Sequence, residues 1–319
     1  MNTNLMMTCE EFMIYKDVFR KTFPHTSYSN TFPVCAYIFL SRKTEPTEER
    51  LRQCNAILKH HNSIFSTFRG YGQLIFLSLL ATEETPSVKM NLCLASHAAL
   101  KTYFPSSHYL PLLSFYVSDN VETKEYFPLA KEIWNVYKQM QEAHMFLTSA
   151  EDASYAGLIA LDERDSEEIL IETEEIYSYL CENGSFYKNA TQSLSHALAL
   201  CMGEPREKCD RFLELYYSLK DQKLSFGKDF EIVSLGIIAN IGIPIESIRD
   251  DIIEVNDFLK TQKTYGIFGY LKRQRLTHAV MIVAAYMMNA NNELTAAIII
   301  NAIRQIQTGT SAATAAASG

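Results

Sequence analysis

Polar side chains that could do chemistry recur in this sequence where a charged segment gives way to an apolar one. In residues 184–203, GSFYKNATQSLSHALALCMG, a turn with an aromatic ring and a lysine leads into an apolar segment that carries His196. A histidine in this place is either a site residue, able to exchange a proton near neutral pH, or a buried core residue. Gln192 lies one turn before His196 and offers a local hydrogen bond, so the pattern favours the core interpretation.

The same kind of boundary precedes the other apolar segments, and polar residues gather at each of them. If the segments stack as repeats, these boundaries lie on one edge of the molecule and their side chains converge on one mouth. We therefore expect ligand-binding residues among Arg69, His108, His144, Asp152, Lys188, Gln192, His196, Arg275 and His278.

Two of these residues also have a structural interpretation at a helix end. The pattern Ser149-x-x-Asp152 before an apolar run is typical of a helix capping box. His144 falls at the end of an amphipathic segment, where a partly charged imidazole interacts favourably with the helix dipole.

The candidate arginines likewise have two interpretations each. Arg69 would cap carbonyl groups or, if it is buried, would need an anionic partner. Arg275 forms a short basic cluster with Lys272 and Arg273. Such a cluster is usually a solvated face, and here it is also the best candidate in the chain for binding a phosphate or a carboxylate.

The motifs of several catalytic classes are missing from the sequence. It contains no Gly-x-x-x-x-Gly-Lys-Ser/Thr loop, no His-Glu-x-x-His pair and no Gly-x-Ser-x-Gly elbow. No spacing of its histidines and aspartates indicates a metal ion, so we expect no metal site. Whether the protein is an enzyme, and which cofactor it would use, stays open.

Composition narrows the class of protein. The formal net charge of −8 disfavours a general nucleic-acid binder, because neutralising phosphates needs a basic face. The low content of glycine (12) and proline (9) favours helices. The sequence has no signal peptide, its longest apolar run is about half a membrane span, and its seven scattered cysteines form no Cys-x-x-Cys pair. We expect a cytoplasmic protein with neither a nucleic-acid nor a membrane partner.

Apolar segments recur with a period of about forty residues. They begin near residues 33, 71, 109, 149, 190, 229 and 276, and successive starts lie 38 to 47 residues apart. The segments between them are amphipathic at helical spacing. In residues 206–221, for example, Phe212, Tyr216 and Leu219 lie on one face.

This period predicts an all-α fold of about seven αα-hairpin repeats, each pairing an apolar inner helix with an amphipathic outer helix. Such a unit cannot bury its apolar helix alone, so neighbouring units must stack. The stack is either an α/α toroid or a strongly curved α-solenoid. We expect one domain over residues 1–307 and a flexible tail over residues 308–319, which lack large apolar side chains.

Two resemblances follow from particular motifs. Residues 65–70 (FSTFRG), 144–161 and 189–200 resemble the uncharacterised bacterial domain-of-unknown-function family numbered four thousand and three, over most of the chain. That resemblance implies no activity and no site residues. The Gly-x-Phe motifs at residues 184–186 and 266–268 are similar to the repeats of prenyltransferase and terpene-cyclase toroids. Because the acidic Asp-x-Asp-Asp motif is absent, this second resemblance implies only the ring architecture.

Two functions fit these observations. The first is binding of a small, partly apolar ligand in a central cavity, with or without a reaction. The second is a helical scaffold that binds a protein or peptide on a concave face. The inner helices are too apolar to face solvent, and this favours the first function.

Overall fold

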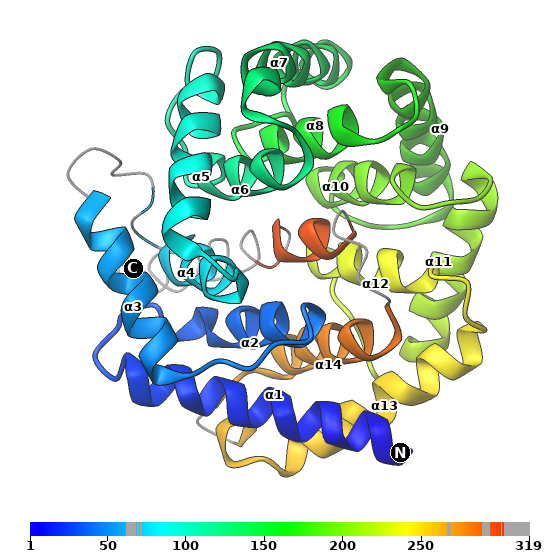
Figure 1. Cartoon of the computed structure of the whole chain (residues 1–319). Helices are drawn as coiled ribbons and strands as arrows, with labels where there is room; N and C mark the ends of the chain where they lie inside the picture. Colours follow the sequence, from blue (N-terminus) through cyan, green and yellow to red (C-terminus); the bar gives the residue numbers. More distant parts are fainter. Residues whose placement is uncertain are drawn as a thin grey trace, which may run out of the picture. The chain divides into compact units, whose positions relative to one another are not determined.

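The computed structural model describes residues 1–61, 68, 70, 72–266, 269–288, 294–300 and 302. In this part of the chain the regular structure is helical and no strand occurs, as Figure 1 shows. The all-α fold predicted from the sequence is confirmed. The candidate Arg69 and the predicted tail at residues 308–319 lie outside the described residues.

Seven helices are apolar on nearly all sides. They are α2 (Phe32–Ser41), α4 (Gly72–Thr82), α6 (Leu110–Asn120), α8 (Asp152–Leu161), α10 (Lys188–Ala199), α12 (Glu231–Ala239) and α14 (Lys272–Met287). Their first residues lie 36 to 43 residues apart. All nine residues of α12 are buried, as expected for a helix without a polar face. We call these seven the apolar helices.

Amphipathic helices alternate with the apolar ones. They are α3 (Glu48–His61), α5 (Pro86–Leu100), α7 (Tyr126–Ala143), α9 (Ser166–Asn183), α11 (Pro205–Asp221) and α13 (Ile245–Thr261). In α13 the buried residues Ile245, Ile248, Ile252, Val255 and Leu259 recur every three or four positions, which gives one buried face. The predicted alternation of the two kinds of helix is confirmed.

Other regular elements in the described part of the chain include an N-terminal helix and short 3₁₀ turns. The N-terminal helix is α1 (Thr3–Thr22), and the turns are η1 (Ser29–Thr31), η3 (Thr123–Glu125) and η4 (Lys263–Tyr265). Residues 294–300 are also helical, and all of them except Thr295 are buried.

The chain divides into two compact units. Among the described residues, the first unit comprises Met1–Ile14 and Leu170–Ala302, and the second comprises Tyr15–Ile169. The boundary falls within α1 and within α9. The predictions of a single domain and of a ring or curved array stay predictions.

Each unit has two layers of helices. In the second unit the apolar helices α2, α4, α6 and α8 pack successively on one another, and α3, α5 and α7 each cover the apolar helix that follows them. In the first unit α10, α12 and α14 pack in the same order, and α11 and α13 cover α12 and α14. Each hairpin therefore buries its apolar helix against its own amphipathic helix and against its neighbours.

Glycines allow close packing between successive apolar helices. A Cβ atom at Gly236 of α12 would lie 2.3 Å from Leu194 Cδ1 of α10, and one at Gly157 of α8 would lie 2.1 Å from Leu113 Cδ1 of α6. In both units, the absent side chain makes room for a leucine of the preceding apolar helix.

An arginine of an amphipathic helix completes the end of the next apolar helix. Arg50 of α3 donates hydrogen bonds to the carbonyl oxygens of Ala81 (3.2 Å), in the last turn of α4, and of Glu84 (3.1 Å), just after it. Arg211 of α11 donates to Ala239 (2.8 Å), the last residue of α12, and to Ile243 (2.6 Å), after that helix. These bonds satisfy carbonyl groups that a helix C-terminus leaves without an intrahelical partner.

Candidate functional site

In the first unit, the junctions before α10, α12 and α14 lie side by side. The Tyr187 N–H donates to the Lys228 carbonyl oxygen at 2.9 Å, which joins the first two junctions. The Arg273 Nε atom lies 3.4 Å from Glu231 Oε1, which joins the second and third. These contacts bring neighbouring helix starts of this unit together, and the convergence of the junction side chains on one mouth stays a prediction.

The second unit has the same arrangement before α4 and α6. A Cβ atom at Gly70 would lie 3.5 Å from His108 Cε1, and one at Gly72 would lie 3.4 Å from the His108 carbonyl oxygen. His108, one of the predicted residues, thus lies against the junction of the preceding repeat, with its side chain exposed.

Buried polar residues recur at intervals of about forty residues in three consecutive apolar helices. Asp152 in α8, Gln192 in α10 and Glu231 in α12 lie 40 and 39 residues apart, and their exposed fractions are 0%, 1% and 4%. Three residues further along each helix stand Tyr155, Ser195 and Ser234, which are also buried. We call these six residues the polar positions. Because residues i and i+3 lie on one helix face, each of the three helices has a buried polar strip, which begins at the first residue of α8 and of α12 and at the fifth residue of α10.

Of the polar positions, Glu231 was missed by the sequence reasoning. Its carboxylate pairs with Arg273, and its Oε1 atom makes no hydrogen bond to the residues that the structure describes. Burial is the largest of the effects that raise the pKa of Glu231 above its ordinary value. The repeat period could have identified Glu231, because this residue follows Gln192 by one period of 39 residues.

The hydroxyl group of Ser234 is buried one turn after Glu231. It makes no hydrogen bond within the described part of the chain. A serine inside a helix commonly satisfies its hydroxyl on a carbonyl of the preceding turn, as Ser195 does on Gln192 at 2.8 Å. Ser234 is thus a buried group whose hydrogen-bonding capacity is unused in the described residues.

Asp152 bonds to Ser149, but the predicted capping box is only half formed. The Asp152 Oδ2 atom accepts a hydrogen bond from the Ser149 N–H at 2.8 Å, whereas the N-cap of α8 is Glu151 and makes no side-chain cap bond. Asp152 also helps to raise the pKa of Tyr137, after the larger effect of burial. His144 is the residue that ends α7, so its predicted place at a helix end is confirmed.

His196 is a buried residue of α10. Its exposed fraction is 1%, and it stands one turn after Gln192. Lys188, at the first position of the same helix, is exposed. The polar residues of α10 therefore run from an exposed lysine at the junction to a buried histidine in the third turn.

His278 lies among aromatic rings at the start of α14. The Tyr265 hydroxyl lies 2.8 Å from His278 Nδ1, and the Tyr270 ring lies 4.9 Å away, edge to face. Burial is also the first cause that raises the pKa of Tyr265 well above its ordinary value. Arg275 Nε donates to Asn256 Oδ1 at 3.0 Å. His278 and Arg275 are thus held by the element that precedes α14 and by α13, respectively.

The basic cluster before α14 has separate partners. Lys272 donates to the Lys223 carbonyl oxygen at 3.0 Å, while Arg273 pairs with Glu231 and Arg275 bonds to Asn256. The three cations therefore bond to different elements, and this arrangement does not favour the joint anion site that the sequence suggested.

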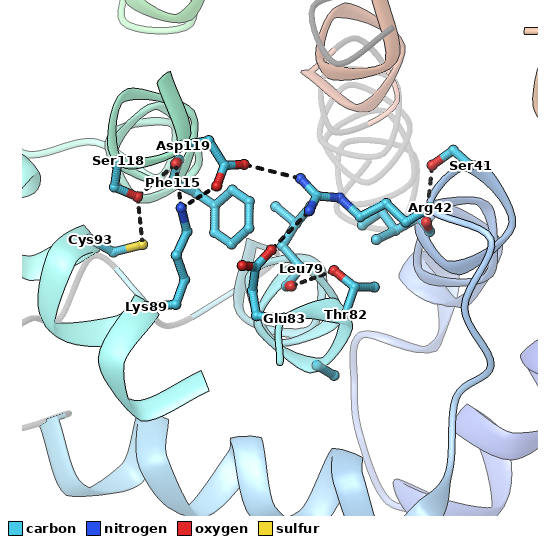
Figure 2. Close-up of polar contacts among 12 residues, drawn as sticks. Ser41, Arg42, Leu79, Thr82, Glu83, Lys89, Cys93, Phe115, Ser118 and Asp119 are labelled. Carbon is cyan, nitrogen blue, oxygen red and sulfur yellow. Dashed lines mark hydrogen bonds and ion pairs between the residues drawn. The ribbon is translucent and has the colours of Figure 1, made fainter. Parts of the chain in front are cut away.

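A second polar cluster, also missed from the sequence, lies at the other ends of the apolar helices in the second unit. Figure 2 shows the Arg42 guanidinium between the carboxylates of Glu83 (2.9 Å) and Asp119 (3.3 Å). Asp119 also pairs with Lys89, whose Nζ atom lies 4.4 Å from the Phe115 ring centroid. We call Arg42, Glu83, Lys89 and Asp119 the charge network.

The charge network is explained by helix packing. Arg42 follows the end of α2, Glu83 follows α4, and Asp119 lies in the last turn of α6, so the ion pairs connect three successive apolar helices. Burial raises the pKa of Glu83, and the nearby Asp119 charge adds to the rise. The network contains two cations and two carboxylates, so their charges balance. Its role is to hold the three helices together.

Two buried lysines occupy one position of the repeat. Lys89 is the fourth residue of α5 and Lys208 the fourth of α11, and their exposed fractions are 5% and 1%. The fourth residues of the other amphipathic helices are Leu51, Leu129, Ile169 and Ile248, all buried. Lys208 pairs with Glu172 of α9 as Lys89 pairs with Asp119. A buried ammonium needs such a partner, because an unpaired charge is strongly disfavoured in the core.

Two properties of the described residues bear on the class of protein. No group of three or more His, Cys, Asp or Glu side chains among them could hold a metal ion. None of the helices in the described ranges is long and apolar enough to cross a bilayer.

Alternating apolar and amphipathic helices with a period near forty residues define an all-α helical-repeat protein. The family described as "Protein of unknown function (DUF4003)" matches residues 14–309. The chain therefore belongs to this family, as its motifs suggested. No curated protein and no solved structure matches the chain significantly.

Proposed function

We propose that this protein binds a small, partly apolar ligand at the N-terminal ends of the apolar helices of the first unit. The observation that carries the proposal is the pair of buried polar residues Glu231 and Ser234 in α12, whose Oε1 and Oγ atoms make no hydrogen bond to the described residues.

The energetics of burial support a ligand at these positions. Burying a polar group without a hydrogen bond costs about 1–3 kcal/mol, so such groups are rarely retained in a core without a reason. Ser234 Oγ and Glu231 Oε1 make no hydrogen bond to the described residues, although the Glu231 carboxylate also interacts with the backbone of Asp229 and Glu231 and with the charge of Arg273. The neighbouring side chains Ile232 and Val233 are apolar and buried. A ligand with a polar group and an apolar body suits these surroundings.

Native mass spectrometry of freshly purified protein tests the proposal. We expect the wild-type protein to retain a ligand, and the variants Glu231→Gln and Ser234→Ala to lose it. Glu246→Gln is the matched control, because Glu246 also lies in the first turn of a helix of this unit but is exposed. A retained mass that survives both substitutions would place the ligand elsewhere. Preparations from two expression hosts without any retained mass would contradict the proposal.

One observation favours the alternative of a scaffold that binds a peptide. A groove of about 200 Å³ lies between α9 and α11, lined by Glu175, Ser178, Tyr179, Glu182, Pro205 and Arg206. Helix α9 contains six glutamates and no lysine or arginine, so a basic peptide would complement its charge. Fluorescence anisotropy with a labelled lysine-rich peptide, and with a glutamate-rich peptide as control, tests this function. Equal binding of the two peptides would contradict it.

We further propose that this binding takes place in the cytoplasm. All seven cysteines are free thiols, and six of them are buried. Free cysteines suit a reducing compartment. Targeting of a fluorescent fusion of the full chain would test the location.

A further inference from the structure

The buried face formed by Glu231 and Ser234 has unused hydrogen-bonding capacity. Their exposed fractions are 4% and 1%, and neither Glu231 Oε1 nor Ser234 Oγ makes a hydrogen bond to the residues that the structure describes. The two residues are separated by three positions, so they lie on the same face of α12. A carboxylate and a hydroxyl group are thus placed side by side as acceptors.

This face is directed away from the preceding apolar helix. Gly236 packs against Leu194 and Leu198 of α10. Ser234 and Gly236 stand two positions apart in α12, which corresponds to about 200° of rotation about the helix axis. Ser234 therefore lies on nearly the opposite side of α12 from Gly236. The polar face is therefore not used for packing α12 on α10; α14 also packs on α12, and its Arg273 contacts Glu231.

The backbone before α12 lies close to the Glu231 carboxylate. A Cβ atom at Gly227 would lie 1.5 Å from Glu231 Oε1 and 2.8 Å from the Arg273 Cζ atom. A side chain at residue 227 would therefore displace both partners of the ion pair. Glycine at this position lets the backbone approach the Glu231 carboxylate closely.

The ion pair between Arg273 and Glu231 is weak. The Arg273 Nε atom lies 3.4 Å from Glu231 Oε1, and 63% of the Arg273 side chain is exposed, against 4% for Glu231. An arginine that binds a carboxylate strongly uses two parallel hydrogen bonds at shorter distance. Arg273 can therefore turn into solvent and leave the carboxylate to another cation.

We infer that Glu231 and Ser234 bind the primary ammonium group of a small organic amine, whose apolar part lies among the neighbouring core side chains. This inference rests on the proposed function and names the class of its ligand. An ammonium group has three donors and no acceptor, which complements two oxygen acceptors. A hydrogen bond between an ammonium and a carboxylate is charge-assisted and stronger than a neutral one. A carboxylate ligand would instead face the like charge of Glu231.

The test measures the binding of three six-carbon probes to the full-length protein at pH 7.5. Hexylamine, hexanol and hexanoate present an ammonium, a hydroxyl and a carboxylate on the same apolar chain, and calorimetric titration with thermal denaturation gives their affinities. We expect hexylamine to bind at least tenfold more tightly than the other two probes. Glu231→Gln should weaken its binding at least tenfold, while the exposed control Glu246→Gln should leave it unchanged.

Arg273→Ala gives a second test that does not depend on a loss of stability. If Arg273 competes with the ligand for Glu231, removing the guanidinium should strengthen hexylamine binding several-fold. Unchanged binding in Arg273→Ala and in Glu231→Gln would overturn the inference.

The outcomes separate this inference from the proposed function. If hexanol or hexanoate binds as tightly as hexylamine, and Ser234→Ala weakens that binding, the ligand site stands and the amine is wrong. If no probe binds at millimolar concentration and native mass spectra show no retained mass, both are wrong.

Discussion

The charge network allows a quantitative test through Asp119→Ala. In the wild-type protein the Lys89 side chain is only 6% exposed and pairs with Asp119. Without this carboxylate, the Lys89 ammonium keeps only the Phe115 carbonyl oxygen at 3.4 Å and the face of the Phe115 ring. Arg42 loses one carboxylate but keeps Glu83 at 2.9 Å. The main effect is therefore an uncompensated charge at Lys89.

The expected loss of stability follows from how deeply the pair is buried. Removing one partner of a fully buried ion pair costs about 3–5 kcal/mol. The Asp119 side chain is 20% exposed, so water solvates part of the network in both proteins. We therefore expect Asp119→Ala to lower the free energy of unfolding by about 2–3 kcal/mol.

A second substitution should rescue the first. Lys89→Leu introduces the kind of residue that four other amphipathic helices carry at this position, such as Leu51 and Leu129. It removes the buried charge and leaves Asp119 paired with Arg42 at 3.3 Å. We expect Lys89→Leu alone to change stability by less than about 1 kcal/mol, because apolar replacements of buried charges are often neutral. The double variant should be at least about 1 kcal/mol more stable than Asp119→Ala.

Urea unfolding followed by far-ultraviolet circular dichroism measures these differences. The control is Glu122→Ala, which removes the Lys124–Glu122 pair of the same unit, where both side chains are more than 70% exposed. That change should cost less than about 1 kcal/mol, as is usual for surface ion pairs. A double variant no more stable than Asp119→Ala would refute the argument that the buried ammonium causes the loss.

Three further substitutions test other parts of the structure. Burial raises the pKa of Glu231 above its ordinary value of 4.5, so this group makes the folded state less stable as the pH rises through the folded pKa. Glu231→Gln should therefore be more stable than the wild type at pH 7, and the gain should disappear below pH 4.5 in urea unfolding; a gain independent of pH would contradict this reasoning. His196→Ala should lower stability by about 1–3 kcal/mol and leave a retained ligand in place. An unchanged melting temperature with loss of the ligand would make His196 a site residue. Gly236→Ala should lower the melting temperature, because a Cβ atom would lie 2.3 Å from Leu194 Cδ1. A higher melting temperature would show that Leu194 moves aside at little cost.

The fold was predictable because helices of two kinds alternate with a regular period. The apolar segments lack a polar face, and a helix of that kind must be covered on most sides. The sequence start expected near residue 229 corresponds to α12, which begins at Glu231, and the start expected near 71 corresponds to α4, which begins at Gly72. Segment boundaries shift by a few residues because caps and turns, more than hydrophobic periodicity, decide where a helix begins.

The candidate site was only partly predictable. Asp152 and Gln192 became candidates because each lies close to a turn that precedes an apolar run. Glu231 had no motif around it, and only its offset of 39 residues from Gln192 identifies it. Arg42 and Asp119 were missed because their contact joins residues 77 positions apart, which local patterns do not encode. That separation is close to two repeat periods, so a comparison of equivalent repeat positions is the signal that could have found it.

The two buried lysines have a consequence for how the chain assembles during synthesis. Hairpins of similar length and similar apolar faces can pair out of order, and proteins built from repeats misassemble in this way. A hairpin carrying Lys89 or Lys208 in the wrong neighbourhood would bury an ammonium without an acid, which is strongly disfavoured. A hairpin with leucine at the same position would accept almost any neighbour. The two lysines therefore disfavour packing of their hairpins in the wrong order, because each ammonium finds its acid only beside the correct neighbour.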